Sequence, residues 1–162
     1  MVKGTNMIKM INKKENIFDD NIAFVENWDF SQANLNEENR ILAITQVASI
    51  CYQSPKALGS ESLYNRLMAE SQGLPSSSFE FVPVLLDFTN EKHKEILAPE
   101  FSNVKKFGEL ISDGKYLLTN YRALVYDFEN NPKTYSFDIR TIYNTLEECE
   151  IIKEHFKVFL YK

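Results

Sequence analysis

The segment from Leu74 to Asp87, LPSSSFEFVPVLLD, most tightly constrains how this chain can fold. A turn of proline and serines leads into aromatic and β-branched residues from Phe79 to Leu86, which is the composition of a buried strand. Glu80 stands at the start of this strand, and a carboxylate withdrawn from solvent needs a partner. We expect Glu80 either to cap the turn at Ser76–Ser78 through nearby backbone, or to face a ligand. Because Pro83 lacks an N–H, the strand lies at a sheet edge or carries a bulge.

Helix signals recur along the chain as a capping residue followed by an apolar stripe. The predicted helices run from about Asn36 to Cys51, from a Ser60 cap to a stop at Gly73 and Pro75, and from a Thr119/Asn120 cap through Phe128. A further stripe formed by Val104, Phe107, Leu110 and Ile111 predicts a helix ending at Gly114. Thr145 and Glu148 form a capping box for a last helix through about His155.

Short extended segments fill most of the intervals. We predict strands or extended stretches at Met7–Asn12, Ile22–Trp28, Lys115–Leu118 and Tyr135–Ile139, and a final strand at Phe156–Tyr161 that is paired within the sheet or with a second chain. The chain of 162 residues is long enough for one core. The fold class is therefore α+β, with a small mixed or antiparallel sheet packed against several helices in a single domain spanning residues 1–162.

Composition excludes several classes of protein. Apolar residues make up 44% of the chain, and the net charge is -5 without a concentrated basic patch, so a globular protein that does not bind nucleic acid is expected. No apolar run reaches membrane-spanning length. Cys51 and Cys149 are far apart, and neither has a second Cys or a His at metal spacing. We expect a cytoplasmic protein with reduced thiols, no metal site and no membrane segment.

Nucleophile-and-base chemistry finds little support in the sequence. His93 lies in a charged segment and His155 near a helix end, and neither adjoins a Ser or Cys that looks activated. There is no glycine-rich phosphate loop, no His-Glu-x-x-His and no paired Asp cluster. Hydrolase, kinase and metalloenzyme interpretations are therefore disfavoured.

An ordered set of segments resembles the N-terminal part of the flavin-dependent thymidylate synthases. The segments are QVASICYQSPK, SESLYNRLMAE, GLPSSSFEFVPVLL and HFKVFLYK. In that family a Ser/Thr-x-Phe-Glu-His motif opens a strand; here it corresponds to Ser77, Ser78, Phe79 and Glu80, with Phe81 in place of the His. The segment Thr119 to Leu124 also resembles the family's Asn-x-Arg-Ser/Ala-Leu helix start, which contacts the flavin.

The resemblance implies a cofactor, a substrate and site residues. FAD would be bound by Ser77 and Glu80 and, through the second motif, by Asn120 and Arg122. The implied chemistry is reductive methylation of dUMP with methylenetetrahydrofolate, in which reduced FAD supplies the hydride. Family members bind dUMP between the subunits of a tetramer, so a homo- or hetero-oligomer is expected.

The family's Arg-His-Arg signature, which normally follows the strand that HFKVFLYK resembles, is absent from the sequence. Its arginines and serine bind the flavin and the dUMP phosphate, so the chain lacks the main counter-charges for an anionic substrate. Two hypotheses follow. The chain is the N-terminal part of a split or truncated thymidylate synthase, inactive until a second chain supplies the signature, or it is a non-catalytic binding or regulatory protein, such as a virus-encoded inhibitor, on the same scaffold. In a third, purely structural interpretation, the segment SSSFEF forms a turn and part of the core and has no ligand-binding role.

Overall fold

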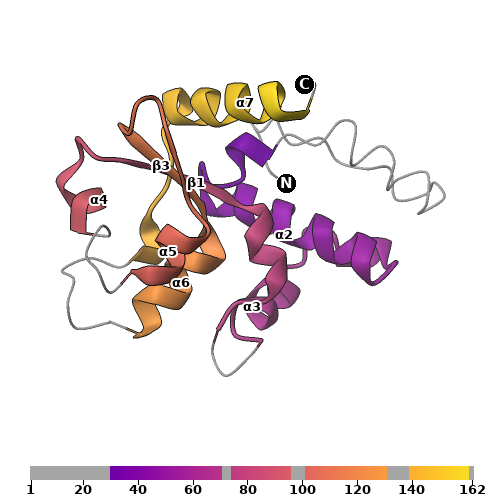
Figure 1. Cartoon of the computed structure of the whole chain (residues 1–162). Helices are drawn as coiled ribbons and strands as arrows, with labels where there is room; N and C mark the ends of the chain where they lie inside the picture. The colour runs from indigo at the N-terminus through magenta and orange to yellow at the C-terminus, as the bar shows by residue number, and fades with distance from the viewer. Residues whose placement is uncertain (1–29, 71–73, 96–100, 131–138, 161–162) are drawn as a thin grey trace.

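The computed structural model describes residues 30–70, 74–95, 101–130 and 139–160 and has the predicted α+β class (Figure 1). A three-stranded antiparallel sheet is packed against helices. The α-helices are α2 (Glu37–Cys51), α3 (Glu61–Met68), α4 (Glu91–Glu95), α5 (Ser102–Lys106), α6 (Tyr121–Asn130) and α7 (Leu146–Leu160). Short 3-10 helices are η1 (Phe30–Gln32), η2 (Pro55–Ala57), η3 (Ser77–Phe81) and η4 (Ile139–Thr141).

The sheet has the strand order β1-β3-β2, so β3 is central. The strands are β1 (Pro83–Asp87), β2 (Glu109–Ile111) and β3 (Tyr116–Asn120). In the β1–β3 register Leu85 lies opposite Leu118, and in the β2–β3 hairpin Leu110 lies opposite Leu117. Of the two alternatives predicted for the strand carrying Pro83, an edge position or a bulge, the structure has the edge position, where a proline removes no ladder hydrogen bond.

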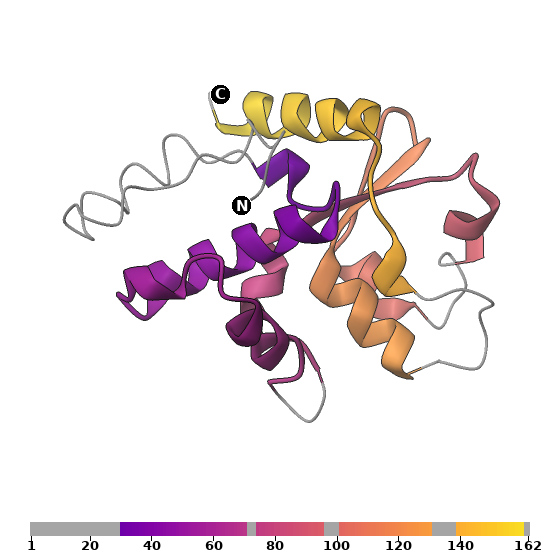
Figure 2. The same cartoon turned by 180° about the vertical axis from the view of Figure 1, so that it is seen from behind.

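Helices cover both faces of the sheet, as the two opposite views show (Figures 1 and 2). Leu85, Tyr116 and Leu118 form a small apolar cluster with Ile152 of α7 on one face. Side chains of the opposite face, including Val84 and Leu117, join the main core with α2, α3, α5, α6 and η3. Alternate residues of a strand point to opposite faces, so β1 and β3 are buried on both sides.

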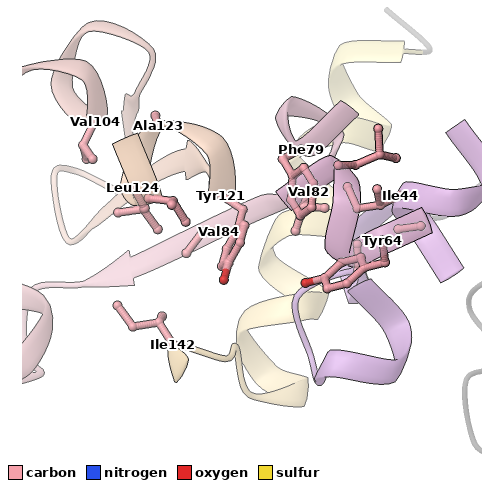
Figure 3. Packing of buried hydrophobic residues seen from close by; sticks show 14 of the residues in the cluster. Ile44, Tyr64, Phe79, Val82, Val84, Val104, Tyr121, Ala123, Leu124 and Ile142 are labelled. Carbon is pink, nitrogen blue, oxygen red and sulfur yellow. The ribbon is translucent and has the colours of Figure 1, made fainter. Parts of the chain in front are cut away.

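The main core is centred on Phe79. Its fully buried ring lies 5.4 Å from the Tyr64 ring and 5.9 Å from the Tyr121 ring, centroid to centroid. Figure 3 shows Phe79 and Val82 between Tyr121 of α6 and the side chains of Ile44 and Tyr64. Tilted aromatic pairs at these distances are favourable beyond the area that they bury. The segment from Leu74 to Asp87 thus supplies the centre of the core.

Three predicted helix starts are confirmed in detail. The Asn36 side chain accepts a hydrogen bond from Asn39 N at 2.8 Å, and the Ser60 hydroxyl accepts one from Leu63 N at 3.2 Å. The predicted capping box is complete, with Thr145 N donating to Glu148 Oε1 at 2.8 Å and Glu148 N donating to Thr145 Oγ1 at 3.1 Å. Each side chain satisfies an amide that a helix leaves without an internal partner.

The boundaries of two predicted elements were wrong. Residues 79–82 are not part of the strand, because the serine turn continues as η3 to Phe81 and the strand starts at Pro83. The predicted helix ending at Gly114 is instead α5, a break and β2. At the break, a Cβ on Gly108 would lie 2.5 Å from the Val104 carbonyl oxygen, so a side chain there would need the backbone to shift. Leu110, assigned to the helical stripe, is 62% exposed.

The predicted final strand, including its proposed pairing with the sheet or a second chain, was also wrong. Residues 156–160 belong to α7, which continues past His155 to Leu160. Cys149, Ile152 and Phe156 are spaced as on one face of a helix, and this face packs inward. The helical spacing therefore determines the structure of this segment, although the residues from Phe156 onward alternate as in a strand. The predicted strands at Met7–Asn12 and Ile22–Trp28 and most of the extended stretch at Tyr135–Ile139 lie outside the described residues.

Candidate ligand-binding pocket

A pocket of about 300 Å³ lies where η3, α5 and the start of α6 meet. Three of the four residues assigned to cofactor binding, Glu80, Asn120 and Arg122, line it. The remaining lining residues come from α5, the residue after it and α6, and are Asn103, Phe107, Ala123 and Tyr126. The fold thus brings together two sequence motifs that are separated by about forty residues.

The Glu80–Arg122 ion pair forms the charged wall of this pocket. Arg122 Nη1 donates to Glu80 Oε2 at 2.9 Å, and Arg122 Nε donates to the Pro75 carbonyl at 3.2 Å. The Arg122 and Glu80 side chains are 35% and 50% exposed. A guanidinium held by a carbonyl on one edge can present its other edge to an anion or to a planar acceptor.

Backbone contacts explain why Glu80 and Arg122 meet. Tyr121 N donates to the Val82 carbonyl at 2.9 Å, which joins the first residue of α6 to the end of η3. The Asn120 side chain accepts from Ala123 N at 2.9 Å and so caps α6, as predicted. Arg122, the second residue of this capped helix, is therefore directed towards η3.

Asp127 stabilises the side of the pocket that α5 forms. Its buried carboxylate accepts from Val104 N and from Asn103 Nδ2, both at 2.8 Å, so it ties α5 to α6. Phe107 is 59% exposed and lines the pocket, with the Lys106 ammonium 5.5 Å from its ring centroid. An exposed aromatic face beside an ion pair is suited to stacking a planar ligand.

Two expectations for the SSSFEF segment need correction or qualification. Glu80 is not withdrawn from solvent and does not cap the serine turn; Ser76 does so, its Oγ accepting from Ser78 N at 3.3 Å. Ser77 is exposed in the first turn of η3 and is not among the residues that line the pocket. Asn103, Phe107 and Tyr126 were missed, because Phe107 was assigned to the apolar stripe of a predicted helix and no motif marks Asn103 or Tyr126.

A second arginine, Arg40 of α2, lies in the core and is only 2% exposed. Its donors reach Asn34 Oδ1 at 2.7 Å, the Arg140 carbonyl at 3.1 Å and the Tyr143 hydroxyl at 3.2 Å. The guanidinium carbon stacks over the Tyr121 and Tyr143 rings, 4.4 and 4.6 Å from their centroids. Among the described residues no carboxylate forms a salt bridge with it, so oxygen dipoles and π faces stabilise this charge.

Arg40, Asn34, Tyr121 and Tyr143 form what we call the Arg40 cluster, and its hydrogen bonds continue through Asn144 to the edge of the sheet. Asn34 Nδ2 donates to Asn144 Oδ1 at 3.3 Å, and Asn144 N donates to the Asn34 carbonyl at 2.9 Å. Burial raises the pKa of the neighbouring Tyr121 phenol well above its usual range, which keeps that phenol neutral. With its donors committed and its surroundings closed, this cluster has the properties of a structural network.

The other candidate groups in the described part of the chain are two histidines and two cysteines, and His155 lines a separate pocket of about 540 Å³ beside α7. His93 is buried against β1, whereas His155 Nε2 lies 3.2 Å from Glu109 Oε2. Cys51 is exposed and Cys149 is buried, and no disulfide joins them. Within residues 30–70, 74–95, 101–130 and 139–160, no group of His, Cys, Asp or Glu side chains could hold a metal ion. In the same residues, no helix has the length and apolar character needed to cross a membrane.

The chain was compared with protein-family models, with curated proteins and with solved structures, and none of the three comparisons gives a match. The assignment of the pocket therefore depends on its own geometry and on the motif resemblance.

Proposed function

We propose that this chain supplies one wall of the FAD pocket of a flavin-dependent thymidylate synthase-like protein and is inactive alone. One observation carries the proposal: Glu80, Asn120 and Arg122, named from two separate motifs, line a single pocket. Unrelated surface residues would have no reason to meet in this way. The ion pair and the α6 cap give the three residues defined positions.

The residues of the pocket suit the ring system of a flavin better than its phosphates. Phe107 offers an exposed face for stacking, Arg122 offers donors and Glu80 offers acceptors. The pyrophosphate would need several cations, yet the only cationic side chain among the described lining residues is Arg122, which is already paired. In the proposed complex, FAD would supply redox chemistry for methylation of dUMP, and Arg122 and Glu80 would orient it.

A second chain is part of this proposal, because Arg122 is the one cation among the described lining residues and is already paired with Glu80, and these residues include no histidine that could act as a base. The partner would carry the arginine-rich signature and complete the open side of the pocket. The complete assembly is then a hetero-oligomer, and neither chain turns over dUMP alone.

A flavin titration tests the proposal. We expect the purified chain to quench FAD fluorescence with a Kd of about 0.1 to 1 mM, as a few stacking and polar contacts would give. Arg122→Gln should weaken binding at least about threefold, whereas Arg66→Gln, on the exposed face of α3, should leave it unchanged. Absence of saturable binding, or equal effects of the two substitutions, would overturn the flavin-side role.

A non-catalytic binding or regulatory protein on the same scaffold is the second candidate. The observation that favours it is the ion pair in the pocket, because Glu80 already neutralises the charge of Arg122 and occupies one of its edges. This candidate predicts no flavin binding and no restoration of dUMP methylation by a protein that carries the signature. The same titration, followed by a reconstitution assay, separates the two candidates.

A further inference from the structure

The outer edge of β1 is closed by side chains. Phe88 N donates to the Lys115 carbonyl and Tyr121 N donates to the Val82 carbonyl, so even-numbered residues of this segment bond β3. Since bonding direction alternates along an antiparallel strand, Pro83, Leu85 and Asp87 direct their backbone groups outward. A free edge of this kind is a template for unwanted strand pairing.

The backbone nitrogens of these three residues are each accommodated in a different way. Pro83 has no N–H. Leu85 is bonded by the Asn144 side chain, which accepts from Leu85 N at 3.4 Å and donates to the Leu85 carbonyl at 2.9 Å. Asp87 N donates to His93 Nδ1 at 2.9 Å. Of the three side chains involved, those of Pro83, Asn144 and His93, only the histidine can gain or lose a proton in the pH range of cells.

We propose that His93 is a proton-sensitive latch that holds helix α4 against the edge of β1 and releases it on protonation. As an acceptor from Asp87 N, Nδ1 carries no proton, so the neutral ring has its proton on Nε2. Protonation places a hydrogen on Nδ1, facing the Asp87 N–H, and two donors cannot bond each other. His93 is 6% exposed, so the imidazolium would also lose solvation where it lies.

The charged groups around His93 modulate the latch without reversing it. Burial lowers the pKa of His93, although Glu148 of α7 and Asp87 of β1 act in the opposite direction. The Asp87 carboxylate is engaged by Thr89, accepting from its N at 2.9 Å and its Oγ1 at 2.7 Å. On α4 itself, Glu91 and Lys94 pair with each other at the exposed surface, 3.1 Å apart.

The sign of the pH dependence follows from this direction. The pKa of His93 is lower in the folded state than in the unfolded chain, where it is about 6.5. The latch therefore stabilises the fold fully at pH values above about 6.5. The contribution is lost as the pH falls below that value towards the folded pKa. Release opens the edge of β1 at Asp87 and frees α4, while Asn144 still covers Leu85.

The two histidines of the chain provide a matched pair for the test. His93→Asn keeps an acceptor near the Nδ1 position but does not titrate, and His155→Asn removes the other histidine. Between pH 7.5 and 5.0 we expect the hydrogen-exchange protection factor of the Asp87 amide to fall about fivefold to tenfold in wild type and in His155→Asn, as loss of one hydrogen bond would give. In His93→Asn it should stay constant within about twofold.

Two results would overturn the latch. One is a protection factor that stays constant in wild type or falls equally in His93→Asn. The other is a nitrogen NMR spectrum of wild type at pH 7.5 that places the ring proton on Nδ1 of His93. The spectrum needs no variant, so it decides the matter even where His93→Asn fails to fold.

Discussion

Arg40 and Arg122 show how one residue type serves two purposes in a single fold. Arg40 is 2% exposed, and its donors are directed to oxygens of Asn34, Tyr64, Tyr143 and two backbone carbonyls. Arg122 is 35% exposed and has one carboxylate and one carbonyl as partners. A fully committed buried cation organises the core, whereas a partly committed cation in an open pocket can exchange its partner for a ligand. The two regions should therefore respond very differently to substitution.

Replacing Arg40 should have the largest effect. Arg40→Met retains volume but removes the donor to Asn34 Oδ1 and one of the two donors to each of the Arg140 and Ile142 carbonyls, so we expect the unfolding free energy to fall by about 3 to 5 kcal/mol. Urea denaturation measures this directly. Arg66→Met on the exposed face of α3 is the control and should change stability by less than about 0.5 kcal/mol. A loss below about 1 kcal/mol for Arg40→Met would remove the distinction between the two arginines.

Asn144 extends the Arg40 region to the sheet, and its removal should have the next largest effect. Asn144→Leu leaves both backbone groups of Leu85 unbonded at a buried position, which should cost about 2 to 3 kcal/mol. Asn65→Leu, at an exposed position of α3, is the matched control. Equal melting temperatures for the two variants would show that the edge of β1 does not depend on Asn144.

Tyr121→Phe separates stacking from hydrogen bonding within the cluster. The ring over Arg40 remains, but the bond from the hydroxyl to the Arg140 carbonyl, at 3.3 Å, is lost, so we expect a loss of about 1 kcal/mol. Burial raises the pKa of this phenol, so wild type should also lose stability as the pH rises above the unfolded value of about 10. Thermal melts at pH 7 and 10.5, with Tyr52→Phe as the exposed control, test both effects.

The Glu80–Arg122 pair should contribute least to stability. A double-mutant cycle with Glu80→Gln and Arg122→Gln should give a coupling energy below about 1 kcal/mol, because half-exposed ion pairs are screened by solvent. The coupling should decrease further in high salt. A coupling as large as the effect of Arg40→Met would mean that the pocket is a structural element and would weaken its assignment as a binding site.

The sequence predicted those features that depend on local chemistry. Ser60, Asn120 and Thr145 were each identified as caps because a side-chain oxygen bonds an amide three residues away, and this contact needs no knowledge of the rest of the fold. The missing N–H of Pro83 likewise indicated an edge position or a bulge, and its strand lies at the edge.

Features that depend on distant partners were not predictable. Nothing around Arg40 in the sequence indicates that its side chain donates to the carbonyls of residues 140 and 142. Asn103 is likewise positioned by a hydrogen bond to Asp127, which lies 24 residues further along the chain. The alternation in HFKVFLYK suggested a strand, but its helix is selected by packing of Ile152 against Leu85 and Tyr116. Glu80 and Arg122 were paired only through motif resemblance, since neither residue alone marks a pocket.

The Arg40 cluster also bears on how the chain folds as it is synthesised. Arg40 meets partners that lie 100 to 103 residues further along the chain. At about 5 to 20 residues per second, α2 would wait on the order of 5 to 20 s before these oxygens are translated. Until then Arg40 lacks three of the oxygens that accept hydrogen bonds from it in the folded state, which opposes its premature burial. The cation would thus delay collapse of the N-terminal half until the segment that completes it has emerged from the ribosome.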